Sequence, residues 1–181
     1  MAGVGAGWQV ACNSEKSEYG PGKWIFAHIF LNYPELKSVF DIQDGVCESE
    51  LVKNPKFVAH AKRFTNLLQM IIEGLDALDD SLGPLLFSYG AKHVQFEEQL
   101  SFSPEYWSHF AEAMIEYAGT WKVKGGGRGE TVRSWRIVVF FVVHKMREGF
   151  DHEKRKSRMR RSSRSLSDLN RIQYLTIDRP I

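Results

Sequence analysis

The sequence predicts an all-α domain of six to eight helices that carries a basic C-terminal extension. Several segments repeat apolar residues at helical spacing, and two of them, after Asn54 and Ser103, begin with a capping residue followed by proline. No segment alternates apolar and polar residues as a half-buried strand would, and no internal repeat is present. We therefore expect helices packed on helices, without a sheet.

The composition is that of an ordinary globular chain. Of 181 residues, 43% are hydrophobic and 25% are charged, which is enough apolar material for a sizeable core. The longest uninterrupted apolar run, 137–143, is too short to span a bilayer, and the first residues resemble neither a secretory nor a myristoylation signal. Two cysteines, Cys12 and Cys47, are too few for a disulfide framework. These features predict a cytoplasmic protein with free thiols.

The expected elements follow one another along the chain. Residues 1–22 are Gly-rich and polar, and Trp8 and Val10 are their only promising apolar anchors. After them we expect a helix over 23–33, a short helical turn ending at Phe40, a polar connector over 41–53, a helix over 54–72, a break, a helix over 81–93, a loop over 94–102, a helix over 104–122 and a last helix over 131–150.

Two of these segments allow a second interpretation. The Gly-rich stretch 123–130 could cradle a phosphate, but no strand precedes it and no Lys-Ser/Thr pair follows it, so we expect a turn. The β-branched run 138–143 has strand propensity. The length of its segment and the helical spacing of its apolar residues favour a helix.

Two histidines occupy the apolar faces of their predicted helices. His60 lies inside a stripe formed by Phe57, Ala61 and Phe64, and His93 closes the stripe of the next long helix. A buried histidine must find a hydrogen-bond partner, bind a ligand or remain neutral at a desolvation cost. A satisfied core histidine is one interpretation of either residue. Two such histidines facing each other would also fit a flat apolar cofactor with an axial metal.

At this point the sequence resembles the globin family. Pro34, followed six residues later by Phe40, resembles the helix-C proline and the phenylalanine that packs on the haem. His60 falls where the distal histidine belongs, and the segment YGAKH, which ends at His93, resembles the proximal segment of neuroglobin-like globins. The last predicted helix is similar to globin helix H. The resemblance covers about residues 8–150 and is greatest to invertebrate, nematode-type globins.

The resemblance implies a globin fold around haem b and a set of site residues. His93 would be the proximal iron ligand and His60 the distal one. The remaining residues expected to contact the haem are Phe26, Phe40, Arg63, Phe64, Tyr89, Trp107 and Phe110, with Arg63 placed to meet a propionate. Before residue 23 the match is weak, and a leading helix A is expected to be short or truncated.

The distal residues decide between two kinds of haem chemistry. Phe26 and Phe64 stand where tight oxygen binders often place a hydrogen-bond donor, which leaves His60 as the only evident one. We expect His60 to ligate the iron, giving a bis-histidyl, six-coordinate haem suited to electron transfer or to redox or oxygen sensing rather than to bulk oxygen storage. Such a protein is expected to be a non-enzymatic haem protein. A five-coordinate globin that binds O2 or another diatomic ligand reversibly is the alternative. A cofactor-free helical interaction module is the third class.

The last part of the chain differs in charge from the rest. Residues 1–150, the predicted globin domain, carry 15 basic and 18 acidic residues, a net charge of −3, whereas the tail 151–181 carries 9 and 4, a net charge of +5. The basic run 154–164 is either a solvated, disordered extension or a contact for anionic lipid or an acidic partner. It contains no interleaved aromatic residues, so we do not expect it to bind nucleic acid.

Overall fold

The structure is a computed structural model that describes residues 2–14, 20–43, 45–122 and 127–177. These residues form helices and connecting turns, and none of them lies in a strand. The α-helices are α1 (Ala2–Ser14), α2 (Gly20–Asn32), α3 (Leu36–Val39), α4 (Glu48–Leu51), α5 (Pro55–Glu73), α6 (Gly83–Leu100), α7 (Tyr106–Gly119) and α8 (Arg128–Ile177). The all-α prediction is therefore confirmed.

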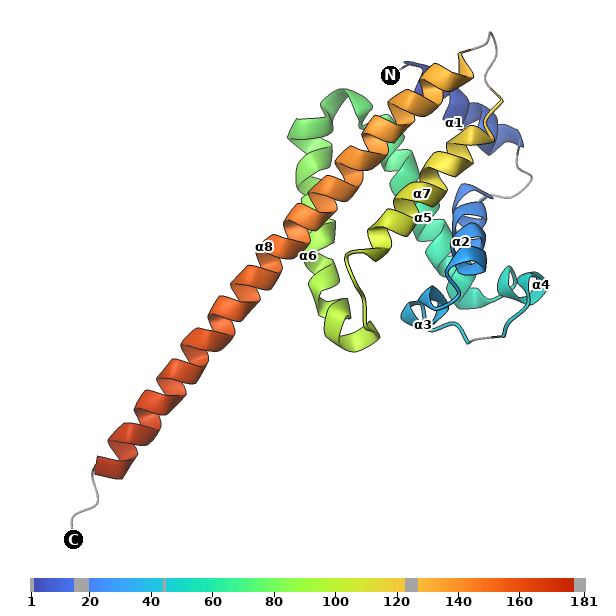
Figure 1. The fold of residues 1–181 in the computed structure, drawn as a ribbon. Helices are drawn as coiled ribbons and strands as arrows, with labels where there is room; N and C mark the ends of the chain where they lie inside the picture. Colours follow the sequence, from blue (N-terminus) through green and yellow to red (C-terminus); the bar gives the residue numbers. More distant parts are fainter. Residues whose placement is uncertain (1, 15–19, 44, 123–126, 178–181) are drawn as a thin grey trace.

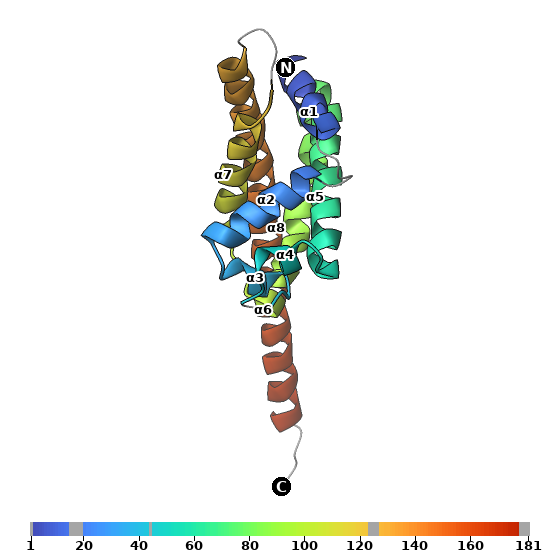
Figure 2. The same cartoon turned by 90° about the vertical axis from the view of Figure 1, so that its right-hand side faces the viewer.

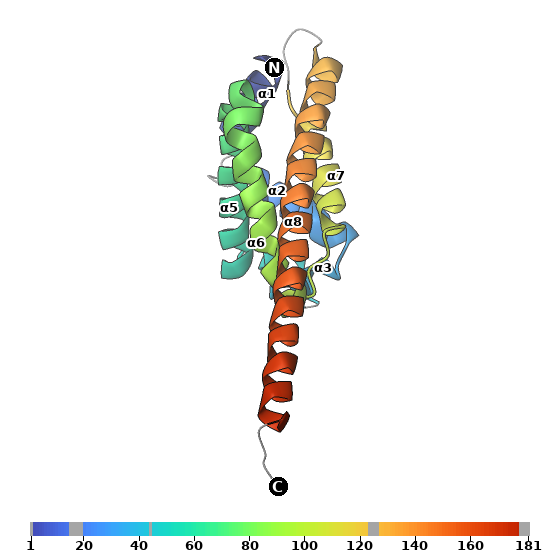
Figure 3. The same ribbon diagram turned by 90° about the vertical axis from the view of Figure 1, so that its left-hand side faces the viewer.

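The helices pack in crossed pairs around α8, the longest of them. Helices α6 and α7 flank α8 on two sides, and α2 crosses between α5 and α7 (Figures 1, 2 and 3). A one-turn 3-10 segment, Leu75–Ala77, and a π-turn, Leu78–Leu82, join α5 to α6. Helix α5 begins as predicted, because the Asn54 side chain accepts hydrogen bonds from the backbone N–H groups of Lys56 and Phe57.

The N-terminal segment is helical and is anchored by Trp8, as predicted, and also by Val4. Its first 13 described residues form α1, a short helix whose Val4 and Trp8 side chains are buried. The Trp8 ring packs edge-on against Trp121 at 6.4 Å between centroids, and Trp121 in turn lies 5.5 Å from Trp135 of α8. Trp8 also donates from Nε1 to the Gln69 side chain at 2.6 Å. Tertiary contacts therefore hold a Gly-rich helix whose sequence shows little amphipathic pattern.

Helix α6 is longer than predicted and lies very close to α8. The prediction of a loop over 94–102 was wrong, because α6 continues to Leu100. The helix ends where Ser101 adopts a left-handed conformation with φ of 54°. A Cβ atom added to Gly90 would lie 1.9 Å from the Met146 carbonyl oxygen, and one added to Gly149 would lie 1.9 Å from that of Phe87. The two helix backbones therefore approach each other at positions where only glycine fits.

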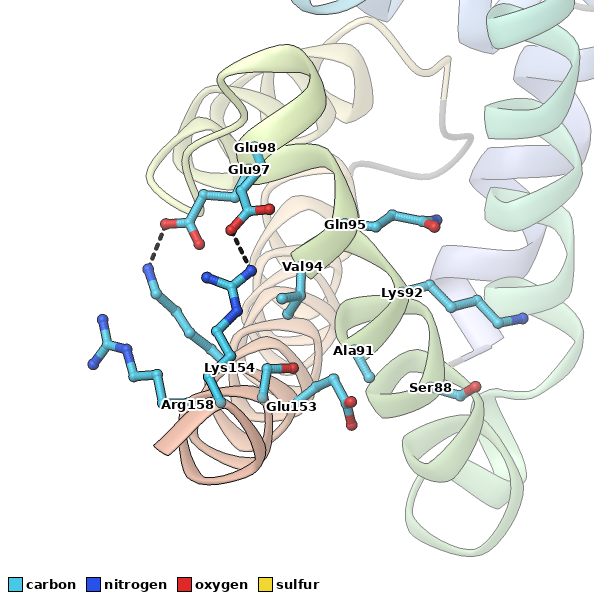
Figure 4. A pocket seen from close by; sticks show the side chains of 12 residues that line it. Ser88, Ala91, Lys92, Val94, Gln95, Glu97, Glu98, Glu153, Lys154 and Arg158 are labelled. Atoms are coloured by element: carbon cyan, nitrogen blue, oxygen red, sulfur yellow. Dashed lines mark hydrogen bonds and ion pairs between the residues drawn. The ribbon is translucent and has the colours of Figure 1, made fainter. Parts of the chain in front are cut away.

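Helix α8 continues through the predicted boundary at residue 150. The basic run 154–164, for which a disordered extension was one interpretation, is helical, and α8 continues to Ile177 and leads away from the body (Figure 1). Residues 178–181 lie outside the described part of the chain. The basic side chains near the start of the extension contact α6, where Lys154 pairs with Glu97 and Arg161 pairs with Glu98 (Figure 4). Across the described residues, no helix is long and apolar enough to cross a membrane.

Candidate cofactor site

His93 projects from α6 with one ring nitrogen already engaged. Its Nδ1 lies 2.7 Å from the backbone carbonyl oxygen of Tyr89, one helical turn earlier. A carbonyl oxygen can only accept, so Nδ1 carries the hydrogen and Nε2 of the neutral ring keeps a free lone pair. Burial lowers the pKa of His93, and the hydrogen bond to Tyr89 opposes that shift. The ring is therefore neutral near pH 7 and oriented for ligation through Nε2.

Three aromatic rings lie close to the ring of His93. The centroids of Phe96, Phe102 and Trp107 lie 5.7, 5.3 and 5.5 Å from that of His93. The sequence predicted Trp107 but not Phe96 or Phe102. Both missed residues lie in the segment expected to be a loop, and Phe96, three residues after His93, would have been suggested by continuing the helical spacing.

His60 projects from α5 toward a group of phenylalanines. Its ring centroid lies 4.9 Å from that of Phe40 and 6.2 Å from that of Phe26. Burial lowers the pKa of His60, and the positive charge of Arg63 lowers it further. No hydrogen bond or ion pair joins the His60 side chain to another described residue. His60 is thus a neutral, half-buried imidazole without a structural partner.

The phenylalanines predicted to line the site form one cluster. Phe26 lies at its centre, 5.1 Å from Phe40, 5.5 Å from Phe64 and 5.3 Å from Phe110 between ring centroids. These rings come from α2, the turn after α3, α5 and α7. Two further members, Phe30 and Phe57, were not predicted as site residues, although Phe57 belongs to the same helical stripe as Phe64.

Helix α7 joins the surroundings of the two histidines. Trp107 contacts His93, whereas Phe110 belongs to the phenylalanine cluster next to His60. Residues three apart on a helix lie on one face, with Cβ atoms about 5–6 Å apart. The two groups are therefore neighbours, and both histidines border a common aromatic region. Its rings come from α2, the turn after α3, α5, α7, and the end of α6 with the turn that follows it.

Arg63 and Tyr89 lie beside this region. Arg63 is exposed on α5, where its charge acts on His60, and its contact with a haem propionate stays a prediction. Tyr89 is half-buried and supports His93 through its carbonyl oxygen. Its ring also has the Lys92 ammonium 5.6 Å from its centroid. Tyr89 thus takes part in the site through its backbone, which sequence reasoning does not reveal.

The donor set fits a metal that arrives inside an organic cofactor. Within the described ranges, no three His, Cys, Asp or Glu side chains gather closely enough to hold an ion by themselves. What the site offers is two neutral imidazoles and many aromatic rings. An iron porphyrin brings four nitrogen ligands of its own and a flat apolar surface, so axial imidazoles and aromatic walls are what it requires.

The chain is similar in sequence and in fold to several known proteins. The chain is 29% identical over 137 residues to Globin-related protein glb-13 of Caenorhabditis elegans, covering 76% of this chain but about half (47%) of that relative's length. Globin-like protein Glb-12 from C. elegans has a similar structure, with a TM-score of 0.67, 21% identity and coverage of 85% of this chain and 90% of the other.

A hexacoordinated heme protein from an anhydrobiotic tardigrade is also similar in structure, with a TM-score of 0.67 and 18% identity over 81% of this chain and 89% of that one. The expected resemblance to nematode-type globins is confirmed by the two C. elegans proteins. Residues 23–146 match the Globin family model, which is more than half of the sequence. The chain therefore belongs to the globin family.

Proposed function

We propose that this globin binds haem with His93 as the proximal ligand. The observation that carries the proposal is the 2.7 Å contact between His93 Nδ1 and the Tyr89 carbonyl oxygen. Metal-binding histidines usually donate their other ring N–H in this way, which fixes the tautomer and raises the basicity of the ligating nitrogen. The phenylalanine cluster would cover the porphyrin face and exclude water from it. Haem b is the form that we propose, because the globin resemblance implies it and the sequence has no Cys-x-x-Cys-His motif for covalent haem attachment.

We further propose that His60 is the second axial ligand. Its lowered pKa keeps a lone pair available at neutral pH, and no other described residue competes for that nitrogen. The phenylalanines around it supply no alternative hydrogen-bond donor. A histidine tethered on a helix reaches an effective concentration of the order of mM at a nearby site. The fold similarity to a hexacoordinated tardigrade heme protein supports the same arrangement.

This arrangement supports electron transfer or redox or oxygen sensing. The haem would supply a one-electron couple and a site for diatomic ligands. His60 would then have to dissociate from the iron before O2 or another diatomic molecule could bind. The apparent affinity for that molecule would equal the intrinsic affinity multiplied by the fraction of sites from which His60 has dissociated. Reversible O2 binding at a five-coordinate site remains the second candidate, favoured if His60 only donates a hydrogen bond. In either case we expect the chain to act in the cytoplasm.

The visible spectrum of the reduced protein tests the proposal. With His60 as sixth ligand, the ferrous wild type should show the split, sharp bands of a low-spin haem. The rate of carbon monoxide binding should then be limited by the rate at which His60 dissociates from the iron. His60→Leu should give a five-coordinate high-spin spectrum and should bind carbon monoxide without this limit on the rate. A broad high-spin ferrous spectrum in the wild type would support the reversible O2 binder instead.

A second pair of variants tests the proximal ligand. His93→Ala should leave a helical protein that loses haem or holds it weakly, because it removes the oriented Nε2. The matched control is His144→Ala, since His144 is exposed on α8 and should not affect haem content. Stoichiometric haem and an unchanged Soret band in His93→Ala would show that the assignment is wrong.

A further inference from the structure

The basic run 154–164 carries three serines on the outer part of α8. Seven of its eleven residues are Lys or Arg and none is acidic, and its serines are Ser157, Ser162 and Ser163. Ser157 is half-buried and lines the cleft between α6 and α8, whereas Ser162 and Ser163 are exposed. Beyond this cleft α8 leads away from the body (Figure 1). Ser162 and Ser163 are therefore accessible to another protein.

Two arginines precede Ser163 at the spacing that basic-directed kinases recognise. Arg160 lies three residues before Ser163, and Arg161 lies two residues before it. Such serine kinases select substrates by charge and hold the arginines at these two positions in an acidic groove. A guanidinium suits this groove because it forms paired, charge-assisted hydrogen bonds with carboxylates. Neither of the other two serines of the run has arginines at both positions.

The hydroxyl group of Ser163 is bonded within its own helix. Ser163 Oγ donates to the Met159 carbonyl oxygen at 3.0 Å, a type of bond that slightly destabilises a helix. Helices in proteins owe most of their stability to packing against other elements, and this part of α8 leads away from the body (Figure 1). The segment around Ser163 can therefore open locally at a small cost, as a substrate that binds a kinase in extended form must.

Both arginines of the motif already contact carboxylates of the protein itself. Arg161 Nη2 lies 2.6 Å from Glu98 of α6, and Arg160 Nη1 lies 4.0 Å from Glu153 (Figure 4). The arginine side chains are 73% and 63% exposed, respectively, so these ion pairs contribute little to stability. The carboxylates of a kinase can therefore replace them. Because Glu98 belongs to α6, it competes with the kinase for one of the two recognition arginines.

We propose that Ser163 is a phosphorylation site for an arginine-directed serine kinase and that the Arg161–Glu98 ion pair restrains its use. The γ-phosphoryl group of Mg-ATP is transferred to Ser163 Oγ. The bond from the γ-phosphorus to the bridging oxygen breaks, ADP leaves, and the hydroxyl proton passes to the catalytic aspartate of the kinase.

The phosphate changes the charge of the extension. Seven basic residues and no acidic one give the run 154–164 a charge of +7, and a phosphoserine adds about −2 at neutral pH. The run therefore falls to about +5, which opposes the attraction to anionic surfaces predicted for it. The site lies outside the proposed haem site and does not depend on haem being bound.

Phosphorylation of the full chain by the catalytic subunit of cAMP-dependent protein kinase tests the site. With Mg-ATP, the wild type should take up phosphate at Ser163, located by fragmentation mass spectrometry. Ser163→Ala should incorporate phosphate at least tenfold more slowly. Ser157→Ala is the matched control, because Ser157 lies in the same run without both arginines and should leave the rate unchanged. Phosphate found mainly at another serine, or equal incorporation by Ser163→Ala and the wild type, would overturn the proposal.

Variants of the charged partners test recognition and restraint. Arg160→Ala should lower kcat/KM for phosphorylation at least tenfold, and an unchanged value would overturn the recognition. Glu98→Gln frees Arg161 and should raise kcat/KM about two- to fivefold, the range expected for an exposed ion pair. The matched control is Glu97→Gln, because Glu97 pairs with Lys154, which lies outside the motif. If Glu98→Gln has no effect, or if Glu97→Gln gives the same increase, the Arg161–Glu98 pair does not restrain the site.

Discussion

His93 and Tyr89 illustrate how one helical turn prepares a ligand. The four-residue spacing in YGAKH brings the His93 ring onto a carbonyl oxygen of its own helix, so the N–H that points away from the site is already used. His60 lacks such a partner, and its orientation depends on the rings around it. The proximal side is thus preorganised by local structure, whereas the distal side depends on packing.

The pKa shifts of the two histidines predict how stability depends on pH in the haem-free protein. Both pKa values are lowered from 6.5 in the folded chain, mainly by burial. Below pH 6.5 the unfolded state therefore binds protons that the folded state does not, and the free energy of unfolding falls as pH drops toward the folded pKa values. Above that range both states carry neutral imidazoles and the effect vanishes.

Urea unfolding of the haem-free protein at pH 7.5 and at pH 5.5 measures this effect. The wild type should lose stability between the two values, and the double variant His60→Gln, His93→Gln should lose less. The control is His144→Gln, which changes an exposed histidine of α8 outside the site. An equal loss of stability in the wild type and in the double variant would contradict the assignment.

At the scale of elements, the crossing of α6 and α8 decides where His93 lies. Gly90 precedes His93 by three residues and faces the α8 backbone, where its missing side chain makes room for the Met146 carbonyl group. Gly149 makes the reciprocal contact with Phe87 of α6. Neither neighbour is a flexible side chain that could move aside. The proximal helix is thus positioned by backbone contact rather than by side-chain packing alone.

Gly90→Ala should therefore destabilise the protein although alanine favours helix. A new Cβ 1.9 Å from a carbonyl oxygen forces the helices apart, which costs about 1–3 kcal/mol or more. Gly129→Ala is the matched control, because it lies in the first turn of α8 with nothing within 4 Å and should be neutral or stabilising by up to about 1 kcal/mol. Thermal unfolding compares them, and a Gly90→Ala midpoint equal to that of the wild type would refute the close approach.

At the scale of the whole molecule, the extension of α8 meets an acidic part of the body. Lys154 and Arg161 pair with Glu97 and Glu98 of α6, while Lys156 and Arg160 lie 3.9 and 4.0 Å from Glu153. Exposed pairs of this kind contribute about 0–1 kcal/mol each. Several of the cations predicted to meet a membrane are thus turned toward the protein's own carboxylates. The anionic-lipid contact of residues 154–164 stays a prediction.

Deletion of residues 154–181 tests that contact. The haem spectrum should be unchanged, and salt-sensitive binding to anionic vesicles should fall. The full-length variant Arg155→Gln, Arg158→Gln keeps the α6 ion pairs and removes two cations that form no ion pair within the described ranges. It should lose part of the same binding, about 1 kcal/mol per residue. Equal vesicle binding by all three proteins would exclude the electrostatic role.

The sequence by itself determined the helical class, the start of α5 and the family. These features depend on local signals: the capping Asn54 before Pro55, apolar residues at helical spacing, and the positions of Phe40, His60 and His93. It also selected Phe26, Phe64 and Phe110, whose rings meet in one cluster in the structure. Such signals can be interpreted from the sequence because each is contained within one or two helical turns and does not depend on tertiary contacts.

Only the tertiary structure decided the length of α6, the helix at the N-terminus and the path of α8 beyond residue 150. Residues 94–100 carry no stop signal and are helical against α8, which brings Phe96 and Phe102 to His93. Helix α1 depends on Trp8 reaching Trp121, more than a hundred residues away. The physical reason is the same in each case. Weak local preferences are settled by packing against segments distant in sequence, and one sequence does not reveal which segments will meet.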